Sequence, residues 1–179
     1  FMTSRDGKSF RRWNEAFLRP GPESPKRWVY GDGYAAYGLI ATHTGVEGED
    51  DELSFYATGN DWSDTPVQLF RYTLRLDGFV SRSAPYAGGE VVTQPLCFAG
   101  DALHINFATS AAGSLRVVIE DEAGSALPGF DSGELFGDAA DRAVHFDGNL
   151  AALAGQPVRL RFILRDADLY AFQFCTEGK

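Results

Sequence analysis

The feature that most constrains the fold is an alternation of apolar and polar residues in short segments between residues 79 and 174. In one segment Leu103, Ile105 and Phe107 share a face, because successive side chains of a strand point to opposite sides. Turn residues separate the segments, which cover residues 79–83, 89–98, 102–109, 114–121, 143–146, 158–165 and 169–174. Seven short strands at this spacing predict an antiparallel β-sandwich, for which jelly-roll-like wiring is a usual solution.

Segment 158–165 also predicts the polarity of the two sheet faces. Its apolar residues alternate with Arg159, Arg161 and Arg165, so one face is expected to enter the core while the other carries cations. Just before it, residues 149–155 predict one helical turn, with Asp147 or Asn149 as the N-cap and Gly155 following its end. We therefore expect an all-β fold that contains a single short helical turn.

The first 76 residues predict a smaller β segment. Asp6-Gly7 is typical of a two-residue hairpin with a type I′ turn, and Phe10 and Trp13 supply aromatic surface beside it. Three prolines between residues 20 and 25 exclude a helix or a central strand there, whereas residues 68–76 alternate like a half-buried strand. A two- or three-stranded unit is marginal by itself in water, so we expect residues 1–76 to dock on a sandwich formed by residues 77–179.

Composition limits the partners. The 179 residues carry a formal net charge of −9, which disfavours nucleic acid and anionic membranes because both select for clustered Lys and Arg. No apolar run approaches the roughly 20 residues that span a bilayer. Phe1 in place of Met is compatible with a removed leader or upstream segment, and the location stays open between the bacterial periplasm or exterior and the cytoplasm. Cys97 and Cys175 form no disulfide framework; free thiols are favoured, and their pairing stays open.

Several segments carry a family likeness. Residues 150–162 (LAALAGQPVRLRF) and 166–174 (DADLYAFQF), together with residues 75–81 and 106–113, resemble the end of a group of bacterial glycoside hydrolases. In that group a five-bladed propeller, similar to glycoside hydrolase families 32 and 43, is followed by a β-sandwich. Residues 3–10 resemble a hairpin of the last propeller blade. The resemblance implies an origin in sugar processing and a chain made of one partial blade plus the sandwich.

The resemblance also limits what chemistry is expected. Five-bladed glycosidases place three carboxylates on separate blades around the central axis, and two of them must flank the scissile bond. This chain has room for about one blade. We therefore assign no catalytic residue by resemblance.

An acidic and aromatic stretch between residues 28 and 62 is the candidate carbohydrate site. Sugars stack on aromatic rings while carboxylates bind their hydroxyl groups, and no Lys or Arg occurs in this stretch. The alternative is a solvated acidic loop beside a buried aromatic cluster, with Trp62 as a plug between the two parts of the chain. The candidate residues are Trp28, Tyr30, Asp32, Tyr34, Asp61 and Trp62.

The sequence contains one candidate cofactor site, for a calcium ion. Asp166 and Asp168 are predicted to lie in a turn between the last two strands, where sugar-binding jelly rolls often hold structural calcium. The structural alternative is that these carboxylates make Asx-turn hydrogen bonds or pair with Arg161 or Arg165. His43, His104 and His145 lack the spacing of a zinc site.

These residues lead to three hypotheses about the function of the chain. The favoured hypothesis is a non-catalytic C-terminal sandwich module of a glycoside hydrolase, which supports an upstream propeller domain and binds carbohydrate. The second is a small intact glycoside hydrolase that uses Glu23 and Asp32 or Asp61. The third is a structural protein that self-associates into homo-oligomers through exposed strand edges.

Overall fold

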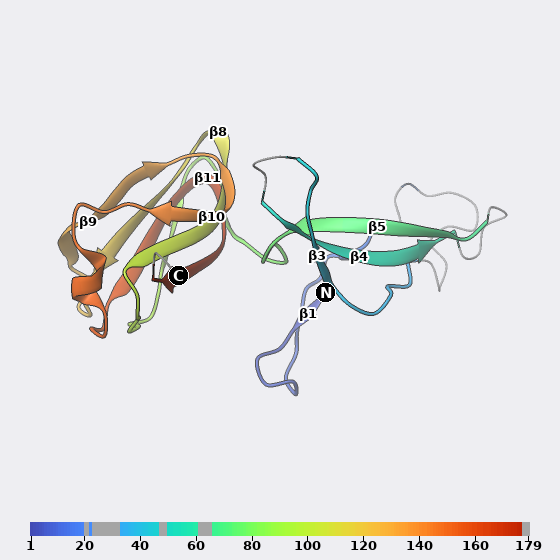
Figure 1. Ribbon diagram of the computed structural model, residues 1–179, viewed down its shortest axis with the longest axis horizontal. Coiled ribbons are helices and arrows are strands. Elements are labelled where there is room, and N and C mark those ends of the chain that lie inside the picture. The colour runs from blue at the N-terminus through green and yellow to red at the C-terminus, as the bar shows by residue number, and fades with distance from the viewer. Residues whose placement is uncertain (20–21, 23–32, 47–49, 61–65, 177–179) are drawn as a thin grey trace. The chain divides into compact units, whose positions relative to one another are not determined.

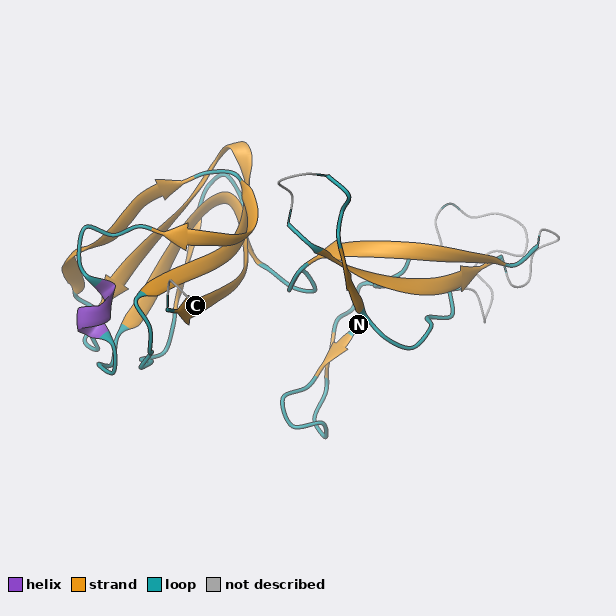
Figure 2. Ribbon diagram, viewed as in Figure 1, coloured by secondary structure: helices purple, strands orange, loops and turns teal. Residues whose placement is uncertain are grey.

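The computed structural model describes residues 1–19, 22, 33–46, 50–60 and 66–176 (Figure 1). Strands and loops dominate the described chain, with a single short helix (Figure 2). Among the described residues, no helix is long and apolar enough to cross a membrane. The elements are β1 (Met2–Thr3), β2 (Arg11–Arg12), β3 (Ile40–Thr42), β4 (Glu52–Gly59), β5 (Gln68–Arg75), β6 (Arg82–Ala84), β7 (Gly89–Val92), β8 (Ala102–Glu120), β9 (Ala126–Leu135), β10 (Asp138–Val144), the 3₁₀ helix η1 (Leu150–Leu153) and β11 (Arg159–Cys175).

The chain forms two compact units. The N-terminal unit comprises Phe1–Thr42 and Leu53–Thr73, and the sandwich unit comprises His43–Glu52 and Leu74–Lys179. The chain leaves the N-terminal unit for the last time between Thr73 and Leu74, inside β5, whereas the sequence placed the division after residue 76.

The sandwich unit is built on two long antiparallel strands, β8 and β11. One half of each strand belongs to a first half-sheet, with the order β9-β8-β11-β7, in which β9 pairs with residues 115–120 and β7 with residues 161–164. The other halves belong to a second half-sheet, with the order β10-β8-β11-β6, in which β10 pairs with residues 103–108 and β6 with residues 167–169. The two half-sheets therefore share their central strands.

A bend divides the two half-sheets. Between the paired positions Arg165↔Ser114 and Ala167↔Thr109, four residues of β8 lie opposite the single residue Asp166. Asp166 has a φ of 45°, in the left-handed region. A Cβ on Gly113 would lie 2.2 Å from the Asp166 carbonyl oxygen, so only glycine allows the two strands to approach this closely. Strands that change sheet through such irregularities make the corners of a sandwich.

The inner faces of both half-sheets enclose one hydrophobic core. Leu103 and Phe107 enter it from the second half-sheet, and Leu115 and Phe162 from the first; all four are fully buried. Before the bulge at Asp166, the core residues of β11 are Leu160, Phe162 and Leu164; after it they are Ala167 and Leu169. The bulge therefore shifts the inward-facing positions of the strand by one residue. The all-β, antiparallel sandwich class expected from the alternation is thus confirmed.

Three details of the strand prediction were wrong. Residues 102–109 and 114–121 are one strand, β8, and residues 158–165 and 169–174 both lie in or beside β11, so the predicted turn at Asp166–Asp168 does not exist. Left-handed backbone at Asp166 bends the strand without reversing it. Strand β9 was missed because its segment contains a proline and two glycines among few apolar residues.

The short helical turn is confirmed. Leu150–Leu153 form a 3₁₀ helix whose first turn is capped by Asn149, since the Asn149 Oδ1 accepts a hydrogen bond from the Ala151 amide at 3.1 Å. Gly155 follows it with a φ of 77°.

The N-terminal unit contains a three-stranded sheet of order β3-β4-β5. On one face, Arg71 donates from Nε to the Ser54 hydroxyl at 2.9 Å and from Nη2 to the Thr42 hydroxyl at 3.1 Å, linking all three strands. Phe55 is the centre of an aromatic row, with Phe17 and Tyr72 stacked beside it at 5.4 and 5.3 Å.

The N-terminal hairpin differs from the prediction. Strands β1 and β2 pair with Thr3 opposite Arg11, so seven residues, not two, connect them. Gly7 has a φ of 69° while Asp6 does not reach positive φ, which excludes a type I′ turn at Asp6-Gly7. The Asp6 carboxylate instead accepts hydrogen bonds from the Lys8 and Ser9 amides at 2.8 and 2.7 Å, and this local network organises the longer loop. Phe10 is 59% exposed.

Candidate functional site

The predicted aromatic and acidic site falls largely outside the described residues. Trp28, Tyr30, Asp32, Asp61 and Trp62 all lie there, as does Glu23 of the hydrolase hypothesis. Tyr34 is described: its side chain is 56% exposed, and its carbonyl oxygen accepts a hydrogen bond from the Thr58 amide at 2.9 Å. Tyr34 therefore lies beside the end of β4 with its ring in solvent.

The predicted calcium ligands lie at the bend of β11. The Asp168 carboxylate accepts a hydrogen bond from the Ser81 hydroxyl at 2.6 Å, and the Asp166 amide donates to the Pro85 carbonyl oxygen at 3.1 Å. Calcium requires six to eight oxygen ligands. Over the described chain, no group of three or more His, Cys, Asp or Glu residues is placed to hold a metal ion. The alternative pairing with Arg161 was wrong, because Arg161 bonds Glu120 and Glu90.

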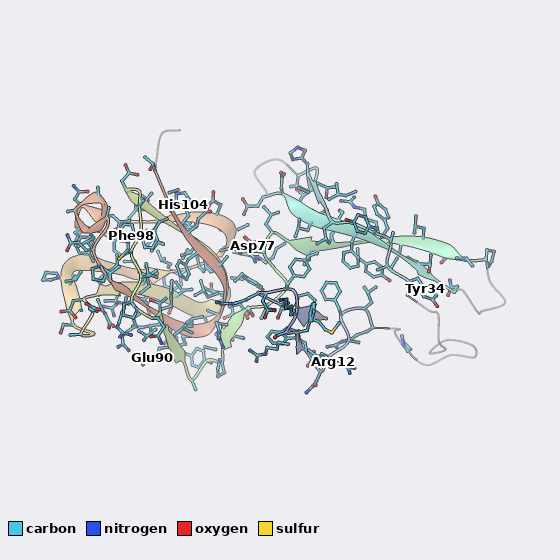
Figure 3. The ribbon with its side chains drawn as sticks, turned by 90° about the horizontal axis from the view of Figure 1, so that it is seen from below. Arg12, Tyr34, Asp77, Glu90, Phe98 and His104 are labelled. Atoms are coloured by element: carbon cyan, nitrogen blue, oxygen red, sulfur yellow. The ribbon has the colours of Figure 1, made fainter. Side chains whose placement is uncertain are left out.

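An open groove of about 430 Å³ lies on the outer face of the first half-sheet of the sandwich unit. We call it the outer-face groove; the side chains that line it include Glu90, Ser114, Arg116, Glu134, Ile163 and Arg165. It crosses β7, β11, β8 and β9. Glu90 is labelled in Figure 3.

Strand register explains why these side chains meet. Ile163 of β11 is the direct partner of Glu90 on β7 and of Arg116 on β8, and Arg116 is the direct partner of Glu134 on β9. The four residues form one row across four strands, at positions that alternate with the core residues. The next row contains Arg165 opposite Ser114. The outward-facing residues of these strands thus line the groove, while the alternate, inward-facing residues build the core.

Ion pairs order the charged groups of this face. Arg116 bonds both carboxylate oxygens of Asp131, with Nε to Oδ1 at 2.7 Å, and this contact raises the pKa of Arg116 and lowers the pKa of Asp131. Arg161 donates to Glu120 at 2.5 Å and to Glu90 at 2.7 Å, which raises its own pKa. Bidentate and bridging arginines hold their partners in defined geometry, so the face is preorganised.

The polar groups that remain differ in character. Glu134 accepts a hydrogen bond from the Ser114 hydroxyl at 3.1 Å. Arg165 lies over the ring of Tyr86, with 5.1 Å between its guanidinium carbon and the ring centre, and its Nη2 donates to the Ala112 carbonyl oxygen at 3.5 Å. Carboxylates, a guanidinium, a hydroxyl and the exposed edge of Ile163 together offer a surface suited to a polyhydroxylated ligand.

The two glutamates of the groove come from its two outermost strands. Glu90 and Glu134 are separated by two intervening strands, which places their Cα atoms about 14 Å apart at the usual strand spacing. Both side chains lean toward the two central strands, because Glu90 bonds Arg161 of β11 and Glu134 bonds Ser114 of β8.

A smaller pocket of about 90 Å³ lies on the second half-sheet, beside His104, which Figure 3 labels together with Asp77. The His104 Nδ1 is 2.7 Å from the Asp141 Oδ1, while its Nε2 is buried without a hydrogen-bond partner. Asp77, with a φ of 54°, and Asn106 complete the polar lining. At about 90 Å³ the pocket is too small for most organic ligands.

Neither the outer-face groove nor the pocket beside His104 was predicted from the sequence. The alternation did indicate that Arg161 and Arg165 lie on an outward face, but it contained no information on which strands are neighbours. Glu90 and Glu134 come from β7, which is shorter than predicted, and β9, which was not predicted. Comparison of the chain with protein families, with curated proteins and with solved structures finds no match.

Proposed function

We propose that the sandwich unit is a non-catalytic carbohydrate-binding module that uses the outer-face groove, in a protein derived from sugar-processing enzymes. The observation that carries the proposal is the row Glu90–Ile163–Arg116–Glu134, because it combines acceptors and donors for hydroxyl groups with an apolar contact at its centre. Each carboxylate of the row already bonds a neighbouring side chain, which holds it in place and supports a binding role.

Isothermal titration with a panel of oligosaccharides tests the proposal. We expect saturable binding with dissociation constants in the micromolar to millimolar range, since an open groove buries a modest part of its ligand. Glu134→Gln should weaken binding several-fold, because the carboxylate is replaced by a weaker acceptor. Asp147→Asn, an exposed carboxylate outside the groove, is the matched control. Absence of heat with every saccharide, at millimolar concentration, would exclude the proposed function.

We also propose a scaffolding role for the N-terminal unit, which its exposed apolar side chains support. Tyr37, Leu39, Ile40 and Leu69 are each more than half exposed. In the proposal this unit packs against the neighbouring β-sheet of a propeller blade. Light scattering at increasing protein concentration distinguishes this from self-association: a monomer is expected, whereas a stable dimer would favour the homo-oligomer hypothesis.

A further inference from the structure

The charges on the outer face of the first half-sheet are unequally neutralised. Arg116 is held by Asp131, and Arg161 is held by Glu120 and Glu90. Arg165 differs, because its contacts are the Tyr86 ring and a backbone carbonyl oxygen, and no described carboxylate pairs with it. Arg165 is therefore the cation of the groove that still lacks a counter-ion within the part of the chain described.

The backbone of Arg165 is closely packed although its side chain is exposed. Arg165 directly precedes the bulge at Asp166, and its carbonyl oxygen lies 2.7 Å from the place where a Cβ on Gly113 would be. The guanidinium carbon lies 5.1 Å from the centre of the Tyr86 ring and Nη2 donates to the Ala112 carbonyl oxygen, which leaves further N–H donors of the guanidinium for a ligand. A planar guanidinium presented in this way binds a carboxylate through two parallel hydrogen bonds.

The neighbours of Arg165 limit the ligand to one that combines an anion with hydroxyl groups. Ser114, its direct cross-strand partner, is bonded to Glu134, and Glu90 lies across the groove. These carboxylates accept hydrogen bonds from hydroxyl groups and repel densely charged polyanions. A neutral sugar would leave the charge of Arg165 unused, whereas one carboxylate on each polyhydroxylated ring matches both kinds of group.

We infer that the outer-face groove recognises a saccharide containing a uronate, with Arg165 binding the sugar carboxylate and Glu134 and Glu90 accepting sugar hydroxyls. This inference rests on the proposed function and names the ligand class for the same groove. It places the selectivity of the groove on one residue, since Arg116 and Arg161 already have carboxylate partners.

The test is a titration of the full chain with an oligouronate and with its carboxyl-reduced counterpart, matched in length and linkage. We expect the wild-type chain to bind the uronate about tenfold or more tightly, the effect of a charge-assisted bidentate contact. Arg165→Gln should abolish this preference, so that the variant binds the uronate no more tightly than the reduced sugar. Arg165→Lys, which keeps the charge without the planar fork, should retain a small part of the preference. Arg142→Gln, an exposed arginine on β10, is the control and should change neither affinity.

The outcomes separate the inference from the proposed function. Equal affinity for both sugars, unchanged in Arg165→Gln, would overturn the uronate inference and leave carbohydrate binding intact. Tighter binding of a sulfated oligosaccharide than of the uronate would overturn the assignment of a carboxylate. Binding of neither sugar, nor of any other in the panel, would overturn both. Thermal unfolding of each variant, expected within a few degrees of wild type, confirms that a lost preference reflects recognition and not misfolding.

Discussion

The two units of this chain use similar residues to different effect. In the sandwich unit, both faces of the long strands β8 and β11 have defined roles, and the inner faces enclose a continuous core. Of the described residues in the N-terminal unit, the hydrophobic side chains that are buried are Phe55 and Ala57, although the unit is rich in aromatic residues. Its rings stack in a row, and many of its apolar side chains are exposed. Burial thus depends on how many sheet faces close on one another, and aromatic content alone does not produce a core.

The comparison is tested most strongly by truncating one phenylalanine in each unit. Phe162 is fully buried and Phe70 is 38% exposed. Phe162→Ala should lower the free energy of unfolding of the sandwich by about 3–5 kcal/mol, because it removes buried area and leaves a cavity. Phe70→Ala should cost about 1 kcal/mol. Urea unfolding of the full chain, with hydrogen exchange resolved by peptide, assigns each loss to its unit; equal losses would contradict the difference in packing.

Glycine substitutions give a second, smaller contrast. In Gly113→Ala the new methyl group meets backbone carbonyl oxygens of β11, so we expect a loss of about 3 kcal/mol, the upper end for overpacking. Gly7 has no atom within 4 Å of a built Cβ but has a φ of 69°, so Gly7→Ala should cost about 1 kcal/mol through backbone strain alone. Thermal unfolding compares them. An unchanged melting temperature in Gly113→Ala would show that the bend adjusts freely.

Arg75 of the sandwich unit and Arg71 of the N-terminal unit provide the next contrast. Arg75 bonds Asn106 at 2.9 Å and Asp138 at 2.5 Å and lies over the ring of Tyr170, all within the sandwich unit. Because Arg75→Ala leaves the buried Asn106 carbonyl oxygen without this donor, we expect a loss of about 1–3 kcal/mol. Arg71→Ala removes bonds to two hydroxyls that still bond each other, and about 1 kcal/mol is expected. Chemical denaturation of both variants measures the two losses of stability. The loss should be larger for Arg75→Ala than for Arg71→Ala.

The smallest contrast is in acid. Hydrogen bonds from the Ser9 and Lys8 amides and the Ser4 hydroxyl lower the pKa of Asp6 to about 2. A lowered pKa stabilises the folded loop above the ordinary aspartate pKa of about 3.9, and this contribution is lost as the pH falls through about 2. The amide resonances of Lys8 and Ser9 should therefore titrate with a midpoint near pH 2. A midpoint near 4 would mean that the loop is open in solution.

The corresponding carboxylate in the sandwich is Asp131. Its contact with Arg116 lowers its pKa, so its contribution is also present above about pH 3.9 and is lost in stronger acid. The pair is exposed, so Asp131→Asn should cost below about 1 kcal/mol at neutral pH. Stability curves of wild type and variant should converge as the pH falls below the ordinary aspartate range; curves that stay parallel would exclude a role for this ion pair.

Much of the fold class could be predicted from the chain. The alternation in residues 102–109 and 158–165 identified core residues such as Leu103 and Phe162, and the Asn149 cap was anticipated from local chemistry. Turn chemistry was less reliable: the two-residue turn at Asp6-Gly7 and the turn at Asp166–Asp168 were both wrong. At both places carboxylate hydrogen bonds or a bulge satisfied the backbone in another way.

Sequence periodicity by itself determined which residues of each strand share a face, and hence that the chain builds an antiparallel β-sandwich. Only the tertiary structure decided which strands are neighbours, where β8 and β11 bend together, and that Glu90, Ile163, Arg116 and Glu134 form one row. The physical reason is that alternation is a local property of one strand. Pairing between strands far apart in the chain is selected by closure of the common core, which the sequence of any single strand does not contain.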